Sequence, residues 1–275
     1  MEQVYVIAEI GINHNGSVET AKALIEAAKE AGCDAVKFQK RTIDAVYTPE
    51  ELARPRRSVF GETNGDLKRG LEFSREQYVG LADQCRAVGM DWSGSAWDGE
   101  SVTFLASFTP PWLKIPSACI TNGPLVDAYV ATGLPLILST GMSTAREVRE
   151  VVQACAGVPL TLLQCHSAYP SPVAELNLCQ IMALGLTYPT VRIGYSSHTV
   201  SPWPCLMAVA MGARVVEFHL TLDRTLWGSD QAASLEPKAA QKLVEEIRTF
   251  EQAYGTPEKR VMPSEVAIKE KLRRI

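Results

Sequence analysis

The sequence lacks the features that mark several classes of protein. It has no basic excess, with 27 Lys and Arg against 31 Asp and Glu and a net charge of −4, so it offers little to attract nucleic-acid phosphates. No apolar run approaches the roughly 20 residues of a membrane-spanning helix, and acidic Glu2 stands where a signal peptide would be basic. The seven cysteines contain no CxxC pair, which predicts free thiols and a cytoplasmic location.

An alternation of short apolar runs and amphipathic stretches fills the 275 residues. Strands are expected at 4–12, 34–39, 90–96, 112–117, 135–140, 160–167, 191–197 and 214–220. Helices are expected at 17–31, 74–88, 98–106, 123–132, 143–156, 174–185, 203–211 and 237–254. This order predicts an α/β fold, a (β/α)8 TIM barrel, as a single domain over 1–275. A doubly wound open sheet is the alternative, weakened because no GxGxxG follows the first strand.

The longest connection, 40–73, follows the second strand and is rich in Arg, Pro, Gly and Glu. Loops after the strands of a barrel form its active-site face. We therefore expect 40–73 to act as a lid or wall of the site.

All four histidines follow the ends of expected strands; they are His14, His166, His198 and His219. His198 and His219 end adjacent strands, where two imidazoles can share a metal. Glu217 points the same way as His219 on its strand, and Asp230 follows on the next loop. Two histidines with an oxygen ligand would suit Mn, Fe, Co or Zn.

Two lysines lie within apolar strands, Lys37 in AVKFQ and Lys114 in WLKIPS. Lysine is rarely buried without a partner, so these positions indicate either anion binding or Schiff-base chemistry; a lysine extending along the rim is the structural alternative. Serines also end strands, at Ser95, Ser117, Ser139, Ser167 and Ser196. Hydroxyls and ammoniums at one face describe a phosphate or carboxylate site.

Seven segments in order resemble the sialic acid synthase family, which includes the N-acetylneuraminate, legionaminate and pseudaminate synthases. The segments are AEIGINHNGS, DAVKFQ, KIPSACITN, LSTGMST, CHSAYPSP, GYSSHT and EFHLTLDRTLWGSDQAASLEP, and the likeness runs from about residue 4 to 272. The resemblance implies condensation of phosphoenolpyruvate with an aldehyde sugar, typically an N-acylated aminohexose such as N-acetylmannosamine. The products would be a 2-keto-3-deoxy sugar acid and phosphate.

The resemblance also implies roles for single residues. His198 and His219 match the ligands of a divalent metal, usually Mn, with Mg, Co or Zn as alternatives. Positions that hold phosphoenolpyruvate match Lys37, Ser95, Lys114, Ser117, Ser139, Ser167 and Ser196. Gln39, Tyr169 and Asp230 match positions that contact metal, sugar or their waters.

Four positions depart from the family pattern. Cys119 stands where members often carry Glu, and it is expected either as a thiolate base or metal ligand or as a small packed residue. Ser197 and Gln231 replace a common Asp and His, and Asn15 replaces a Glu that some members carry. Glu9 could then supply acid–base chemistry.

Family members usually continue into an antifreeze-like domain that reaches across a dimer and donates an Arg to the partner's sugar site, whereas this sequence ends at LRRI. A homo-oligomer is therefore expected, either barrel-only or completed by a separate antifreeze-like chain. Two rival functions stay open: a lysine-dependent aldolase on the same barrel, and a non-catalytic barrel that binds phosphoenolpyruvate.

Overall fold

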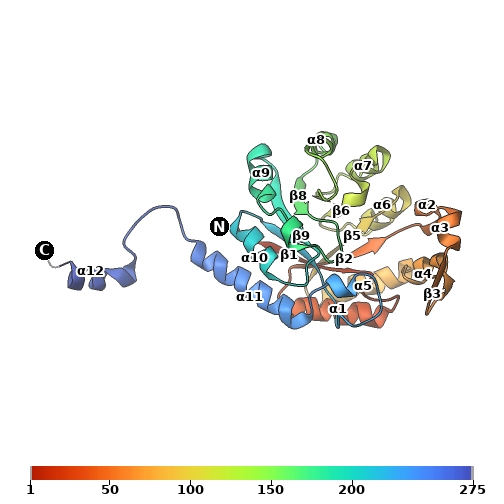
Figure 1. Cartoon of the computed structure of the whole chain (residues 1–275), viewed down its shortest axis with the longest axis horizontal. Helices are drawn as coiled ribbons and strands as arrows, with labels where there is room; N and C mark the ends of the chain where they lie inside the picture. The colour runs from red at the N-terminus through yellow and green to blue at the C-terminus, as the bar shows by residue number, and fades with distance from the viewer. Residues whose placement is uncertain (1, 274–275) are drawn as a thin grey trace.

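Eight parallel strands close into a barrel in the computed structural model, which describes residues 2–273 (Figure 1). They are β1 (Tyr5–Gly11), β2 (Ala35–Lys40), β5 (Asp91–Ala96), β6 (Leu113–Ile115), β7 (Leu136–Ser139), β8 (Leu160–Cys165), β9 (Arg192–Ser197) and β10 (Val215–His219). Each strand pairs with the next in this series, and β10 pairs with β1 to close the ring. The predicted (β/α)8 barrel is confirmed, and the doubly wound alternative was wrong.

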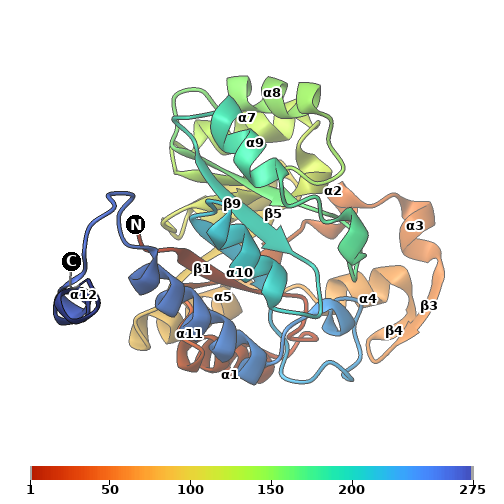
Figure 2. The same ribbon diagram turned by 60° about the vertical axis from the view of Figure 1, so that its left-hand side comes forward.

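Helices cover the outside of the barrel (Figure 2). They are α1 (Val18–Glu30), α5 (Arg75–Ala87), α6 (Gly99–Ala106), α7 (Gly123–Ala131), α8 (Ala145–Ala154), α9 (Gln180–Thr187), α10 (Trp203–Ala210) and α11 (Pro237–Tyr254). A further short helix, α12 (Val266–Leu272), lies away from the barrel at the end of an exposed segment. No helix within residues 2–273 is long and apolar enough to cross a membrane.

Local signals place most of these helices. Ser17 and Ser74 cap α1 and α5 as expected, because their side chains accept the backbone N–H of Thr20 and Gln77. The helix expected at 174–185 begins late, at Gln180. Asn177 adopts a left-handed backbone with φ 47°, which a helix does not tolerate.

Side chains along β1 alternate between the helices and the barrel interior. Val6 and Ala8 pack in the main core under the helices, whereas Ile7 joins a smaller cluster inside the barrel. Glu9 follows Ile7 on the inner side, at the carboxyl end of the strand. Because every second residue of β1 points into the barrel, Ile7 contributes to the apolar interior and Glu9 places a carboxylate at the mouth.

The 40–73 connection is folded. It contains α2 (Ile43–Val46), α3 (Pro49–Ala53), the hairpin β3 (Pro55–Ser58) and β4 (Gly61–Thr63), and α4 (Asn64–Gly70). These elements stand beside the barrel (Figure 2), and an ion pair of 2.7 Å joins Lys40 to Glu72 at their base. No residue of 41–73 lines the pocket at the barrel mouth. The segment contributes no side chain to the pocket lining, and its role as a lid or wall of the site stays a prediction.

Candidate active site

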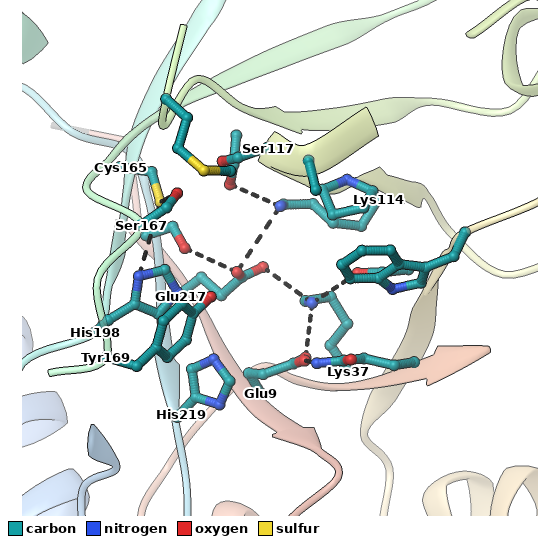
Figure 3. Close-up of a pocket in the computed structure, with 18 residues that line it drawn as sticks. Glu9, Lys37, Lys114, Ser117, Cys165, Ser167, Tyr169, His198, Glu217 and His219 are labelled. Atoms are coloured by element: carbon teal, nitrogen blue, oxygen red, sulfur yellow. Dashed lines mark hydrogen bonds and ion pairs between the residues drawn. The ribbon is translucent and has the colours of Figure 1, made fainter. Parts of the chain in front are cut away.

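A pocket opens at the carboxyl ends of the barrel strands (Figure 3). It is lined by Glu9, Lys37, Gln39, Ser95, Trp97, Lys114, Pro116, Ser117, Ala118, Ser139, Met142, Cys165, Ser167, Tyr169, Ser196, His198, Glu217 and His219. This end of a TIM barrel is where active sites lie.

Lys37 is buried at the base of this pocket. Its Nζ lies 2.7 Å from Glu9 Oε2 and 3.7 Å from Glu217 Oε2, and it donates a 2.9 Å hydrogen bond to Ser95 Oγ. Burial works against the charged form, but the two carboxylates outweigh it and raise the pKa of Lys37. Lys37 is therefore a fixed ammonium, and the alternative of a lysine extending along the rim was wrong.

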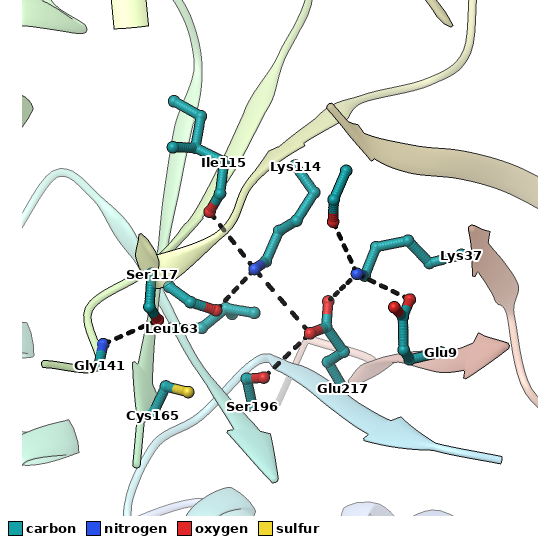
Figure 4. A network of polar contacts seen from close by, with 12 residues as sticks. Glu9, Lys37, Lys114, Ile115, Ser117, Gly141, Leu163, Cys165, Ser196 and Glu217 are labelled. Carbon is teal, nitrogen blue, oxygen red and sulfur yellow. Dashed lines mark hydrogen bonds and ion pairs between the residues drawn. The ribbon is translucent and has the colours of Figure 1, made fainter. Parts of the chain in front are cut away.

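Lys114 is a second buried lysine in the same pocket (Figure 4). It donates a 2.7 Å hydrogen bond to Ser139 Oγ, and its Nζ lies 3.9 Å from Glu217 Oε1. Burial lowers the pKa of Lys114, and the nearby Lys37 charge adds to this, although Glu217 opposes it. The two lysines thus differ in how firmly each holds its proton.

Glu217 lies between the two ammoniums (Figure 4). Burial alone would raise the pKa of Glu217, but Lys114 and Lys37, with a 2.9 Å hydrogen bond from Ser196 Oγ, lower it to about 2. The pKa of Glu9 is instead raised, because its burial outweighs the attraction of Lys37. The buried pair of lysines is therefore balanced by one firmly ionised carboxylate and one that protonates more readily.

Serine hydroxyls complete the polar lining. Ser117 Oγ accepts a 3.1 Å hydrogen bond from the backbone N–H of Gly141. A side chain at Gly141 would collide with Ser167 Oγ and come within 2.9 Å of Ser117 Oγ. The glycine therefore lets both hydroxyls approach the backbone that follows β7, and the hydroxyls with the ammoniums form a site suited to an anion.

His198 and His219 lie next to each other on one side of the pocket, with ring centroids 5.3 Å apart (Figure 3). His198 Nδ1 lies 2.7 Å from the carbonyl oxygen of His166, so it carries a proton that it donates there, and Nε2 is left free for a ligand. His219 Nδ1 is buried and has no hydrogen-bond partner among the described residues. Tyr169 stacks on His198 with centroids 4.0 Å apart.

These two imidazoles fit a divalent metal, since each has a ring nitrogen with no hydrogen-bond partner among residues 2–273. Asp230 Oδ2 lies 3.8 Å from His219 Nδ1 and could supply an oxygen ligand directly or through water. Within residues 2–273, no group of three acidic, histidine or cysteine side chains is arranged to hold a metal. Further ligands would come from substrate or water.

The structure brings most of the predicted site residues together. Lys37, Gln39, Ser95, Lys114, Ser117, Ser139, Ser167, Tyr169, Ser196, His198, Glu217 and His219 all line the pocket, while Asp230 lies just outside its lining. His14 does not reach the pocket: it is buried against Phe73 at 4.2 Å between ring centroids. His166 turns aside, with Nε2 3.1 Å from Glu175.

Cys119 lies in the hydrophobic core and not on the pocket lining. Burial raises the pKa of its thiol to about 11, so the group is neutral. The expectation of a thiolate base or metal ligand is not supported by this position, which agrees with the alternative of a small packed residue.

The sequence reasoning did not select Trp97, Met142 and Cys165, which also line the pocket. Two of them could have been found from the sequence, because residues two apart on a strand point the same way. Trp97 is two residues after Ser95, and Cys165 is two residues before Ser167. Met142 had no such signal, because its φ of 59° brings it to the mouth by a left-handed turn.

The model of the NeuB family matches residues 24–259. N-acetylneuraminate-9-phosphate synthase of Mus musculus is 39% identical over 274 residues, covering 98% of this chain and 76% of that protein. The N,N'-diacetyllegionaminic acid synthase of Legionella pneumophila is 37% identical, over 98% of this chain and 78% of that protein.

The chain belongs to the NeuB family. A solved N-acetylneuraminic acid synthetase from Leptospira borgpetersenii, in complex with citrate, is 31% identical with a TM-score of 0.86, covering 100% of this chain and 94% of that one. The resemblance drawn from the motifs is confirmed, as is the expectation of a synthase-type enzyme.

Three departures from the NeuB-family pattern lie outside the pocket lining. Ser197 Oγ is 3.0 Å from Thr199 Oγ1, and Gln231 is fully buried. Asn15 donates a 2.7 Å hydrogen bond to the carbonyl of Trp227. These side chains form hydrogen bonds within the loops around the site and do not contact its charged lining.

Proposed function

We propose that this enzyme condenses phosphoenolpyruvate with an aldehyde sugar and releases phosphate and a 2-keto-3-deoxy sugar acid. The observation that most strongly supports this proposal is the pair of buried lysines, Lys37 and Lys114. They lie among serine hydroxyls and beside the imidazoles of His198 and His219. The synthases that the chain matches are named for sugar acids of this kind. An N-acylated aminohexose such as N-acetylmannosamine is the proposed acceptor class.

Phosphoenolpyruvate carries a phosphate and a carboxylate, and the pocket offers donors for both. Lys114 with Ser139, and Lys37 with Ser95, are two ammonium–hydroxyl pairs at its base. Held there, the enol carbon C3 would point away from the base and toward the acceptor.

The acceptor would lie on the side of His198, His219 and Tyr169, which contact one another through their rings. His198 and His219 would hold the divalent metal, which we propose to be Mn. When bound, such a metal supplies Lewis acidity to the aldehyde oxygen.

Water is the third reactant of the proposed condensation, and with it the bonds formed and broken balance. C3 of phosphoenolpyruvate forms a bond to the aldehyde carbon, water adds at C2, and the C2–O bond to phosphate then breaks to leave the ketone. Glu217, held ionised, stabilises the positive charge that develops at C2. Glu9, whose pKa is raised, is suited to donate a proton to the alkoxide formed from the aldehyde and then to accept the proton that the attacking water loses at C2.

Phosphate release from phosphoenolpyruvate tests the proposal. The purified chain would be assayed with Mn against N-acylated mannosamines, diamino sugars, pentoses and small aldehydes, with products weighed by mass spectrometry. Acceptor-dependent release that a chelator abolishes supports the synthase and its metal. Tight phosphoenolpyruvate binding without release on any acceptor would overturn it in favour of a non-catalytic barrel.

A lysine-dependent aldolase is the second candidate, because burial lowers the pKa of Lys114 and so favours a nucleophilic amine. It requires a Schiff base, which borohydride would trap as a stable adduct with pyruvate. Adduct at Lys114 that is lost in Lys114→Met would favour the aldolase. Absence of adduct beside metal-dependent phosphate release would exclude it.

We further propose a cytoplasmic homodimer. The seven cysteines are all free in the structure, six of them buried, which supports a reducing compartment. Sedimentation at several protein concentrations tests the dimer. A partner antifreeze-like chain would be detected as acceptor-dependent activity that appears only when that chain is added.

A further inference from the structure

A second cavity opens at the amino ends of the barrel strands, at the opposite end from the active site. Its volume is about 430 Å³, which lies in the range of small-molecule sites. Its wall is largely apolar and includes Trp112, Ile137, Leu160 and Val215. None of its lining residues lines the pocket at the carboxyl ends of the strands. We call it the amino-end cavity.

A layer of buried apolar side chains separates the two sites. Along β1, Tyr5 lines the amino-end cavity, Ile7 packs in the barrel interior, and Glu9 lines the active-site pocket. Leu163 of β8 belongs to the same interior cluster as Ile7, and both are fully buried. Because this layer is closed, a molecule in the amino-end cavity does not reach the catalytic groups and need not be a substrate.

Arg192, the first residue of β9, brings a positive charge to the amino-end cavity. Its Nε is buried and has no hydrogen-bond partner among residues 2–273. Its Nη2 lies 3.0 Å from Glu2 Oε1, but the Glu2 side chain is 65% exposed and precedes the first strand. Exposed ion pairs of this kind stabilise a protein little. The guanidinium therefore has a donor to spare and a partner that a ligand carboxylate can replace.

Aromatic side chains form the wall across from Arg192. Asp91 begins β5, which lies four strands from β9 in the ring of eight. Its Oδ2 accepts a 2.7 Å hydrogen bond from the Tyr5 hydroxyl, whose oxygen accepts a 3.3 Å hydrogen bond from Trp112 Nε1. Since these polar atoms satisfy one another, the surface that Tyr5 and Trp112 offer to a ligand is that of their rings.

We propose that the amino-end cavity binds a small aromatic monocarboxylate. Its ring would lie against Tyr5 and Trp112, and its carboxylate would replace Glu2 as the partner of Arg192. A guanidinium can hold a carboxylate through two parallel hydrogen bonds. The apolar wall disfavours sugars and sugar phosphates, whose hydroxyls would lose water without finding partners there. The site is independent of the proposed synthase function.

Calorimetric titration of the full chain tests the site with 3-phenylpropanoate and its neutral amide. We expect wild type to bind the acid about tenfold or more tighter than the amide, and R192Q to lose that preference. E2Q should bind the acid about two- to fivefold tighter, because it removes the competing carboxylate. R214Q is the matched control: Arg214 precedes β10 at the same end of the barrel but does not line the cavity, so it should match wild type.

Three results would overturn the assignment. Equal affinity for acid and amide in wild type, or no binding of either, would remove the carboxylate site. Displacement of the acid by saturating phosphoenolpyruvate would place it in the active site instead. A dimer in sedimentation that R192Q dissociates, and that excludes the acid, would assign this face to a second copy of the chain. The opposite effects of E2Q and R192Q on acid binding guard against a variant that merely unfolds.

Discussion

The Nδ1 atom of His198 lies 2.7 Å from the carbonyl oxygen of His166. The acceptor is a backbone atom, so the orientation of the His198 ring depends on the path of the chain after β8 and not on the His166 side chain. That side chain instead pairs with Glu175. The roles of the His198 and His166 side chains can therefore be tested separately by mutation.

His198→Ala should weaken Mn binding by about 100-fold or more, since losing a ligand exceeds the 10–100-fold typical of an outer-shell change. His166→Ala should bind Mn within about threefold of wild type, because the backbone carbonyl stays in place. Paramagnetic resonance of free Mn measures both without reference to activity. Equal affinity in wild type and His198→Ala would remove the histidine pair as a metal site.

Glu217 links the stability of the protein to pH. Its folded pKa of about 2 is below the ordinary 4.5, so its ionised form stabilises the folded state fully above pH 4.5, and this stabilisation is lost as the pH falls toward 2. Glu217→Gln should cost about 3–5 kcal/mol near neutrality, because the buried Lys114 ammonium loses its carboxylate partner and Lys37 keeps only Glu9. The difference in unfolding free energy between wild type and Glu217→Gln should narrow as the pH falls from 5 to 2.5.

Urea unfolding at a series of pH values measures that gap. Glu30→Gln, at an exposed position on α1, is the matched control and should track wild type throughout. A gap that stays constant down to pH 2.5 would contradict the ion pairing of Glu217 with the lysines.

Cys119→Ser should retain kcat within about threefold, because the thiol is neutral and packed in the core. Cys119→Glu should instead lower the melting temperature by about 4 °C or more, since it introduces a buried carboxylate without a partner. Calorimetric melting and phosphate release measure the two effects. A large loss of kcat in a well-folded Cys119→Ser would show that the thiol takes part in the chemistry.

Gly141→Ala should raise the Kd for phosphoenolpyruvate about tenfold, or by about 1.4 kcal/mol. The added Cβ would push aside the hydroxyls of Ser117 and Ser167. Gly80→Ala is the control: its Cβ would meet open space within α5, and we expect a slight gain in stability. Unchanged affinity in Gly141→Ala would mean that neither serine contacts the ligand.

The barrel could be predicted from the sequence because its signals are local. Lys37 and Lys114 stood out as single charges in apolar strands, and the period of two fixed which way they point. The capping serines of α1 and α5 were equally readable.

What could not be predicted depends on the exact shape of local turns and on contacts between distant segments. Cys119 and Ser117 are two residues apart, yet the 3-10 turn Ser117–Cys119 directs one into the core and the other to the pocket. His14 matched the strand-end pattern of His198, but packing against Phe73, on a segment far along the chain, takes it out of the pocket.

The balance of charge at the base of the pocket has one more consequence. Lys37 and Lys114 are already matched by Glu9 and Glu217, so a ligand with a phosphate and a carboxylate carries uncompensated negative charge into an enclosed space. Glu9 is the carboxylate most ready to take up a proton. Phosphoenolpyruvate binding should then be proton-coupled: the heat of binding would vary with the ionisation enthalpy of the buffer, and affinity would fall as the pH rises.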